Sequence, residues 1–431
     1  MRILVTGATG FIGSAVLAAL RNHGHEVVAV VRVDDRSAHR LPTGRVVVRD
    51  LARATGPQSW LGHLDGVDAV VNCAGVLQDT SRDSTAGVHV RGVAALFEAC
   101  ERAGVRRVIH LSAIGADPAA PTAFSRTKFQ GEQSLMARDL DWVILRPAVV
   151  VGRSAYGGSA LLRALATLPL LPLEAQSGAV QTVQLDEVTQ TVLFFLNPDA
   201  PARKVLELAD PTQMSVEGVI RCYRRWLGWP PARTVHLPSW LASAIYGVGD
   251  LLGWLGWRPP IRGTARREAA RATVADPSEW RRITGIEPRD LPTALAAEPA
   301  SVQEHWFAQL YLIKPIVLGS LSLFWLFTGL IALGPGFSMG RTLLENAGAD
   351  DTLASIAVIA GATADVLMGI AIAVRRTARP ALVAALAISF LYLVVGTILI
   401  PRLWIEPLGP LVKSVPIIVL NLVALAILDD R

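Results

Sequence analysis

The C-terminal part of the chain constrains the fold most, because it carries four long apolar segments. They cover residues 310–333, 353–374, 380–400 and 408–428. Each is close to the roughly 20 residues that an α-helix needs to cross the hydrocarbon core of a bilayer. Backbone N–H and C=O groups find no water there, so such a segment has to be helical. With short loops between the segments, we expect an all-α bundle of four transmembrane helices.

Charged residues in the loops predict how this bundle is oriented. Arg375, Arg376 and Arg379 lie between the second and third segments, whereas the loop 334–351 is acidic on balance. Cytoplasmic loops of membrane proteins are enriched in Lys and Arg. We therefore expect a multi-pass protein of the inner (cytoplasmic) membrane, with the N-terminal region and the C-terminus in the cytoplasm.

Two charged residues within the apolar segments are candidates for a role in the bundle. Asp365 lies deep inside the second segment, where a carboxylate is costly and is a functional candidate by default. Lys413 in the fourth segment could pair with it. Alternatively, Lys413 extends to the nearer membrane interface, as is expected for Lys314.

Composition narrows the partners of the rest of the chain. The net charge is +5, and many arginines fall between residues 258 and 289, beside the first apolar segment. This position favours anionic lipid headgroups over nucleic acid as the partner. A solvated basic face without a partner is the alternative. The three cysteines have no C-x-x-C spacing and the eight histidines form no metal-ligand cluster, so we expect neither disulfides nor a metal site. The N-terminus enters a strand directly, so no cleavable signal peptide is expected.

A strand, a glycine-rich turn and a helix begin the chain. Residues 2–6 form a short apolar run, and helical spacing of apolar residues begins at Ser14. Glycine allows the backbone to approach a pyrophosphate closely, and a helix N-terminus offers N–H groups to phosphate. The pattern predicts a turn that binds a dinucleotide. The residues assigned to it are Gly7, Thr9, Gly10, Phe11, Ile12 and Gly13.

Four further apolar runs lie at 26–31, 46–48, 69–72 and 108–111, and helical segments such as 88–103 alternate with them. This alternation predicts an α/β fold with a doubly wound parallel sheet. Ligands bind such sheets at the carboxyl ends of the strands, so residues that follow the runs are candidate cofactor contacts. They are Arg32, Arg36, Asp50, Leu51, Cys73, Ala74, Gly75 and Ser112.

The end of the second run bears on the choice of cofactor. Arg32 and Arg36 suit the 2′-phosphate of NADP, whereas an acidic residue would bind the ribose hydroxyls of NAD. Asp34 and Asp35 lie between them. We favour NADP(H), and NAD(H) stays an alternative.

Five motifs in order resemble those of the short-chain dehydrogenase/reductase superfamily. They are TGATGFIG at 6–13, NCAG at 72–75, HLSAIGAD at 110–117, FSRTKFQGE at 124–132 and LRPAVVVG at 145–152. The sequences of these motifs are most similar to those of the atypical branch that includes the NADPH-binding accessory subunit of respiratory complex I. The resemblance covers about residues 1–230. It implies a Rossmann-type fold with a small substrate subdomain, and it places Pro147, Ala148 and Val149 beside the nicotinamide.

The resemblance also implies a catalytic set, from which this chain departs. In the superfamily a tyrosine acts as general acid/base, a lysine four residues later holds the nicotinamide ribose, and a serine polarises the substrate carbonyl. The matching positions are Phe124, Lys128 and Ser112. A phenyl ring has no ionisable hydrogen. Either water or another hydroxyl supplies the proton, or the cofactor is held without turnover. The hydroxyls near in sequence are Ser125, Thr127 and Tyr156.

His89 stands where members of the superfamily often carry asparagine. It either has a role in the site or is a polar helix residue that faces outward.

The membrane region, about residues 305–430, resembles the DoxX-like family of four-helix membrane proteins. EHWFAQLYLIKP and FWLFTGLIAL carry this resemblance. It implies a small membrane module that in some relatives is associated with quinone-linked redox chemistry. We thus expect a nucleotide-binding domain at 1–235, an amphipathic junction and linker at 236–305, and a four-helix transmembrane domain at 306–431. In the junction, 236–260 lies on the bilayer surface or forms core helices, and 262–299 is a linker or a small helical cap.

Three functions fit this organisation. The leading hypothesis is a membrane-anchored NAD(P)H-dependent oxidoreductase acting on a lipophilic substrate, such as a quinone or an isoprenoid. The alternative is a non-catalytic NADPH-binding factor for assembly or stability of a membrane redox complex. The third hypothesis is a transporter-like bundle regulated by nucleotide, which only Asp365 supports.

Overall fold

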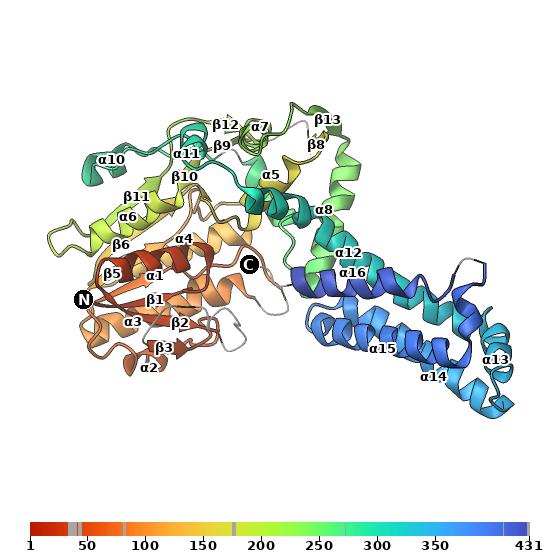
Figure 1. Ribbon diagram of the computed structural model, residues 1–431. Coiled ribbons are helices and arrows are strands. Elements are labelled where there is room, and N and C mark those ends of the chain that lie inside the picture. The colour runs from red at the N-terminus through yellow and green to blue at the C-terminus, as the bar shows by residue number, and fades with distance from the viewer. Residues whose placement is uncertain are drawn as a thin grey trace. The chain divides into compact units, whose positions relative to one another are not determined.

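The computed structural model describes residues 1–32, 41, 45–80, 83–174, 178–271, 273–407 and 409–428. The chain forms two compact units (Figure 1). The first comprises residues 1–251 and 259–305, and the second comprises residues 252–258 and 306–431. Arg36, a predicted cofactor contact, lies outside the described residues, as do Asp34 and Asp35.

A seven-stranded parallel sheet forms the centre of the first unit, in the order β11-β6-β5-β4-β1-β2-β3. The strand order reverses between β1 and β4, which is the switch point where such sheets bind ligands. The predicted doubly wound sheet is confirmed. Its strands are β1 (Arg2–Thr6), β2 (Glu26–Val31), β3 (Arg45–Val48), β4 (Ala69–Asn72), β5 (Arg107–Leu111), β6 (Asp141–Pro147) and β11 (Lys204–Leu208).

Helices cover both faces of the sheet, because successive strand residues point to opposite sides. Leu4, Val28 and Val70 face a core shared with α3 and α4. Ile3, Val27 and Val71 face the core shared with α1 and α6. The helices of the two layers are α1 (Phe11–Asn22), α2 (Gln58–Leu61), η2 (Gly87–Gly92), α3 (Val93–Ala103), α4 (Ala123–Met136) and α6 (Leu185–Leu196).

Two helices differ from the expectation. The first begins at Phe11 rather than Ser14, so Phe11, Ile12 and Gly13 form its first turn. The helix expected from Val88 begins with the π-helical turn η2 and continues as α3. A π-turn closes its hydrogen bonds over five residues rather than four, so it shifts the buried face of the helix by one residue. The spacing of apolar residues does not by itself reveal such an insertion.

Short elements after β6 form a smaller subdomain. Three two-stranded sheets pair β7 with β10, β9 with β12 and β8 with β13. The elements are β7 (Val149–Val151), α5 (Gly157–Leu165), β8 (Leu170–Glu174), β9 (Ala179–Val180), β10 (Thr182–Gln184), β12 (Met214–Ser215), α7 (Val216–Trp226) and β13 (Arg233–Leu237).

The region between this subdomain and the membrane helices is largely helical. It contains α8 (Ser239–Trp254), α9 (Gly263–Ala270), α10 (Ser278–Thr284) and α11 (Leu291–Ala297). Trp280 of α10 is fully buried in the core beside α1 and α6. Its Nε1 donates to Thr191 Oγ1 at 3.0 Å. Residues 259–305 therefore fold onto the first unit as a helical cap.

The second unit is helical, with α12 (Val302–Leu333), α13 (Phe337–Glu345), α14 (Asp351–Ala373), α15 (Ala378–Leu399) and α16 (Ser414–Ile427). Within the described residues, α12, α14 and α15 are long and apolar enough to cross a membrane. The fourth predicted span is shorter than expected, because only 14 residues of it are helical in α16. Pro410 precedes this helix, and proline interrupts helical hydrogen bonding.

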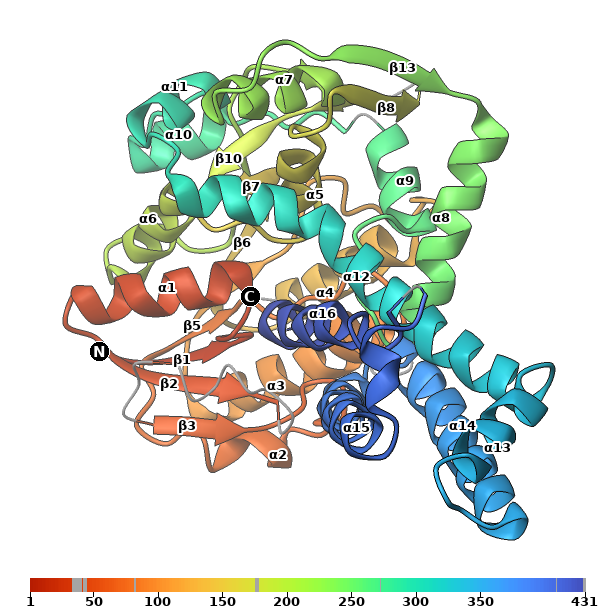
Figure 2. The same cartoon turned by 45° about the vertical axis from the view of Figure 1, so that its right-hand side comes forward.

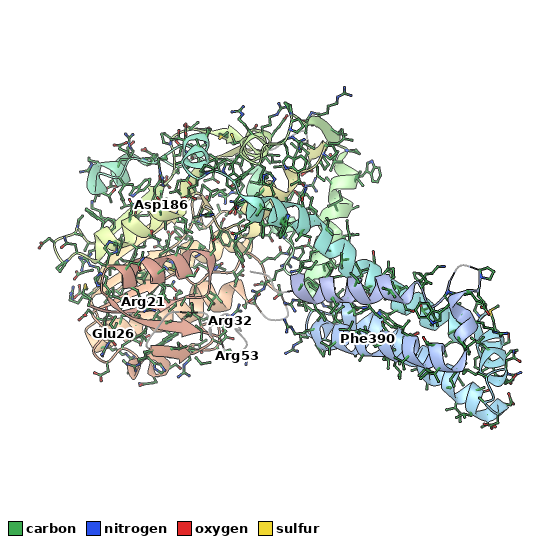
Figure 3. All side chains as sticks on the ribbon, in the orientation of Figure 1. Arg21, Glu26, Arg32, Arg53, Asp186 and Phe390 are labelled. Carbon is green, nitrogen blue, oxygen red and sulfur yellow. The ribbon has the colours of Figure 1, made fainter. Side chains whose placement is uncertain are left out.

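Small residues let α12 and α14 approach closely. A Cβ atom on Gly369 would lie 2.6 Å from Leu326 N, and one on Gly329 would lie 2.5 Å from Ala362 O. Such contacts are typical of helix pairs in membranes. The other faces stay apolar and exposed, as at Phe390 of α15 (Figure 3).

Asp365 is buried within the second unit and has a partner that the sequence did not predict. Its Oδ1 accepts a hydrogen bond from the Tyr392 hydroxyl at 3.2 Å. Lys413 is exposed just before α16, and no ion pair joins it to Asp365 in the described part of the chain. The predicted pairing with Lys413 is therefore wrong. Lys314 instead donates to Leu428 O at the end of α16, at 3.1 Å.

Candidate functional site

The turn after β1 has no room for side chains at its glycines. Gly7 has φ +65°, and a Cβ atom there would lie 2.8 Å from Ala74 N. A Cβ atom on Gly13 would lie 2.1 Å from Gly7 O. Gly10 N donates to Gly7 O at 2.8 Å and closes the turn. The backbone is thus held against residues 73–75, which follow β4.

The first turn of α1 points its N–H groups out of this glycine turn. Gly10 is the N-cap and provides no side-chain cap. Free N–H groups and the positive end of the helix dipole make such a terminus an anion site. The first turn of α1 therefore suits a pyrophosphate.

A buried polar chain joins the ends of three neighbouring strands. Thr6 Oγ1 donates to Asn72 Oδ1 at 2.5 Å, and Asn72 Nδ2 donates to His110 Nδ1 at 2.7 Å. These bonds place the proton of His110 on Nε2. Burial lowers the pKa of His110 well below 6.5, and the Lys128 charge adds to this effect. A neutral His110 therefore helps to lock the strand ends at the switch point.

Lys128 reaches from α4 to the same edge of the sheet. Its Nζ donates to Leu111 O at 2.8 Å, and it lies 3.3 Å from the position that a Cβ atom on Gly75 would take. Burial lowers the pKa of Lys128 to about 8, against the opposing effect of Glu132. The predicted lysine thus lies between the loops that follow β4 and β5.

Ser112 follows β5, and its hydroxyl could form a hydrogen bond with a bound ligand. Its backbone N donates to Leu145 O at 2.7 Å. Its Oγ atom is buried and makes no hydrogen bond within the described residues. A buried hydroxyl of this kind usually has a partner. The arrangement suits an additional polar group, such as a cofactor or substrate oxygen.

Phe124 lies at the N-terminal end of α4, on the same helix face as Lys128. Its ring meets the His89 ring edge-on, with centroids 5.7 Å apart. No proton can come from this ring.

His89 is buried, so the prediction that it faces outward is wrong. Its Nε2 accepts from Val76 N at 3.0 Å. The proton is therefore on Nδ1, which donates to Thr127 Oγ1 at 2.9 Å. Burial lowers the pKa of His89 well below 6.5, and the Lys128 charge adds to this. A neutral His89 ties the loop after β4 to α4.

The π-helical turn that carries His89 is packed without space on two sides. A Cβ atom on Gly92 would lie 2.1 Å from Leu51 O, and one on Gly131 would lie 2.3 Å from His89 O. Leu51, a predicted cofactor contact, thus supports the turn with its backbone. Asp50 closes its own loop, because its Oδ1 accepts from Ala52 N at 3.0 Å.

A group from far along the chain reaches the start of α4, and sequence analysis missed it. Glu268 of α9 accepts hydrogen bonds from the hydroxyls of Thr122 and Ser125, the latter at 2.9 Å. Arg271 donates to Ser125 Oγ at 3.1 Å and to Gly115 O at 3.0 Å. More than 140 residues separate these partners, so no local pattern could have revealed them.

Other predicted residues are held by contacts with neighbouring loops and helices. Arg32, labelled in Figure 3, follows β2 and pairs with Asp83 at 2.7 Å. Ala148 N donates to Leu208 O, and Ile114 N donates to Pro147 O, which ties residues 147–149 to the loop after Ser112. Tyr156 stacks on Phe11 with ring centroids 6.3 Å apart. Among the described residues, no His, Cys, Asp and Glu group forms a metal site.

Comparison with known proteins identifies the family of both parts of the chain. Residues 7–163 match the NAD(P)H-binding family, and residues 322–422 match the DoxX-like family. The chain is 30% identical to the 3-diazoavenalumate denitrifying reductase of Streptomyces sp over 322 residues, which cover 67% of this chain and 100% of the relative. It is 27% identical to the mitochondrial NADH-ubiquinone oxidoreductase 40 kDa subunit of Neurospora crassa, over 67% of this chain and 76% of that protein.

Solved structures share the fold of the first unit. MoeE5 in complex with UDP-glucose and NAD superposes with a TM-score of 0.54 at 22% identity, over 71% of this chain and 98% of that one. UDP-glucuronic acid 4-epimerase from Bacillus cereus gives 0.52 at 19% identity, over 72% of this chain and 100% of that one. The first unit is therefore a Rossmann-type nucleotide-binding domain. The chain belongs to the short-chain dehydrogenase/reductase family and carries a DoxX-like domain behind its NAD(P)H-binding domain.

Proposed function

We propose that the protein is a membrane-anchored NAD(P)H-dependent oxidoreductase that reduces a lipophilic substrate of the quinone or isoprenoid type. The observation that carries the proposal is the presence of a nicotinamide nucleotide domain and a membrane domain in one chain. Two similar proteins have names that refer to lipids, the ceramide reductase of Caulobacter vibrioides and the sterol demethylase protein B of Methylococcus capsulatus. A substrate dissolved in the bilayer would be within reach of such a chain.

This proposal assigns tasks to most of the predicted site residues. The glycine turn, Thr9, Phe11 and Ile12 bind the pyrophosphate. Lys128 holds the nicotinamide ribose, and the unbonded Ser112 hydroxyl binds the substrate oxygen. Residues 73–75 and 147–149 line the nicotinamide, and Asp50 and Leu51 lie near the adenine. The cofactor supplies the hydride, and reduction also consumes one proton.

The source of that proton is the main mechanistic question, because Phe124 cannot provide it. Of the nearby hydroxyls, Thr127 is committed to His89 and to Ala123 O, which accepts from it at 2.7 Å. Ser125 instead contacts a carboxylate, Glu268. A carboxylate can return protons to a hydroxyl that has given one up. We propose that Ser125 and Glu268 relay the proton to the substrate.

The test is oxidation of NADPH by the full chain in liposomes, with a quinone or a lipid carbonyl as acceptor. We expect oxidation that depends on the acceptor, and a lower kcat with an altered pH profile in Glu268→Gln. Phe124→Tyr should restore the usual proton donor in that variant. Tight NADPH binding without oxidation by any acceptor, in the wild type and in Phe124→Tyr, would sink the enzymatic proposal.

That result would support a second function, a non-catalytic NADPH-binding factor for a membrane redox complex. Phe124 at the tyrosine position favours it, as does similarity to a subunit of NADH-ubiquinone oxidoreductase. Co-purification with a respiratory or quinone-synthesising complex would be its evidence.

We propose NADP(H) as the preferred cofactor over NAD(H), on the basis of Arg32. Its side chain is 42% exposed beside the buried carboxylate of Asp83. A 2′-phosphate would gain a charged partner there. We expect Arg32→Ala to weaken NADPH binding about tenfold, or about 1.4 kcal/mol, with little effect on NADH. Equal losses for the two cofactors in fluorescence titrations would contradict the preference.

We further propose the division 1–235, 236–305 and 306–431, and a place in the inner (cytoplasmic) membrane. The nucleotide-binding domain and the C-terminus would lie in the cytoplasm. This orientation is supported by three arginines between α14 and α15, Arg375, Arg376 and Arg379. Positive charge marks cytoplasmic loops.

A further inference from the structure

Helix α8 exposes an apolar face along its whole length. Trp240, Val248, Leu251 and Trp254 recur at helical spacing and are 72%, 57%, 57% and 75% exposed. No charged residue lies among them, since the only charge of α8 is Asp250, on another side. An outward helix face of a water-soluble domain is normally polar. A contiguous exposed apolar patch marks a site of interaction with a partner or a membrane.

The opposite face of α8 is fastened to the first unit. Asp250 accepts from Gln78 Nε2 at 3.0 Å and from Gly263 N at 3.3 Å. A Cβ atom on Gly249 would lie 1.6 Å from Ile261 O. The Arg266 guanidinium lies 5.4 Å from the centre of the Tyr246 ring. Figure 2 shows α8 running beside α9. These contacts prevent the helix from rotating to bury its apolar face.

The last turn of α8 and the residues that follow it, 252–258, belong to the second unit. Leu255 O accepts from Arg375 N at 3.1 Å, and Trp257 Nε1 donates to Ala373 O at 2.7 Å. Ala373 ends α14, one of the candidate spans. Arg375 also lies 5.5 Å from the centre of the Trp257 ring. Trp254 therefore lies one residue from a segment bonded to the end of a membrane helix.

The direct connection of α8 to a segment that contacts the end of α14 indicates what covers the apolar face of α8. The end of a membrane helix lies at the boundary between lipid and water, where Trp is enriched and where arginine meets anionic headgroups. The apolar face of α8 carries a tryptophan at each end, and Trp254 belongs to the segment 252–258 that contacts this helix end. A protein interface of this size would normally include polar groups at its rim.

We infer that α8 is an interfacial helix, whose apolar face lies in the headgroup region of the bilayer that the second unit crosses. Helices with one fully apolar face bind membranes in this way, parallel to the surface. The nucleotide domain would then be held by α8 as well as by its covalent link.

The depth of α8 can be measured in the full chain. The three native cysteines are replaced by alanine, and an environment-sensitive NBD fluorophore is attached at Val248→Cys. The protein is reconstituted into vesicles of phosphatidylethanolamine and phosphatidylglycerol with or without doxyl-labelled lipid. The matched control is Arg102→Cys, an exposed position of α3 among charged side chains. Circular dichroism and a single peak in gel filtration verify the fold of each labelled chain first.

We expect blue-shifted emission at position 248 and quenching by doxyl lipid about threefold stronger than at position 102. Leu251→Cys on the same face should behave like Val248→Cys. Quenching by aqueous iodide at all three positions, without quenching by lipid, would overturn the inference. Cross-linking between two chains through position 248 would also overturn it, because a second copy would then cover the face. The readout is fluorescence, so it is independent of whether the site turns over NADPH.

Discussion

At the scale of single residues, burial determines the chemistry of Lys128. Its pKa of about 8 is below the ordinary value of 10.5, because the charged form is removed from water. The carboxylate of Glu132 limits this shift without abolishing it. A lysine that loses its proton near neutral pH would respond strongly to the arrival of a negatively charged cofactor.

This shift makes stability depend on pH. Between pH 8 and 10.5 the unfolded chain binds more protons at Lys128 than the folded chain, so the free energy of unfolding rises with pH. The full shift corresponds to about 3 kcal/mol. We expect Lys128→Met to remove the rise. The measurement is the unfolding midpoint in detergent from pH 7 to 10, with the partly exposed Lys204→Met as control. Parallel curves for Lys128→Met and the wild type would contradict the assignment.

The glycine turn predicts a second effect of a single residue. A Cβ atom on Gly13 would meet Gly7 O at 2.1 Å, so Gly13→Ala must displace the turn or the helix. We expect NADPH affinity to fall at least about tenfold. Gly56→Ala is the control, because a Cβ atom there meets nothing within 4 Å. Fluorescence titration with NADPH compares the two, and equal affinities would refute the role of the turn.

At the scale of elements, α4 connects most parts of the site. It carries Phe124, Ser125 and Lys128, and it packs against η2 through Gly131. A buried ion pair attaches it to β6: Arg146 Nε donates to Glu132 Oε1 at 2.9 Å, and Glu132 is fully buried. The position of Lys128 therefore depends on this pair, one helical turn away.

Removing one partner should destabilise α4. Glu132→Gln leaves the Arg146 charge with only the more distant carboxylate of Glu207, at 3.9 Å, and breaking a buried pair in this way costs about 3 kcal/mol. Glu98→Gln on α3 breaks more exposed pairs with Arg102 and Arg138 and should cost under about 1 kcal/mol. Denaturant unfolding, followed by loss of bound NADPH fluorescence, measures both. Similar costs for the two variants would show that α4 is held by other contacts.

At the scale of the whole molecule, the chain combines a soluble type of domain with helices that expose apolar side chains. Within the described residues, three helices are long enough to cross a bilayer, and α16 is shorter. A topology that puts the nucleotide site in the cytoplasm gives it access to the cofactor pool.

Orientation can be tested with two exposed loop positions of the second unit. Asn346→Cys lies in the acidic loop before α14, and Arg376→Cys lies in the basic loop after it. We expect a membrane-impermeant maleimide to label residue 346 in intact cells, and residue 376 only after the membrane is opened. The reverse pattern would place the nucleotide domain outside the cytoplasm.

Local patterns in the sequence indicated five of the seven strands, the glycine turn and the apolar segments, whereas Lys128 was assigned by the resemblance to a known superfamily. Each of these patterns depends on spacing within a few residues, which sets backbone conformation and the buried face. Tertiary structure alone decided which distant groups meet. It buried His89 and set its tautomer, brought Glu268 to Ser125, and gave Asp365 the Tyr392 hydroxyl instead of Lys413. Such partners depend on how separate elements pack, and the periodicity of one element carries no information on its neighbour.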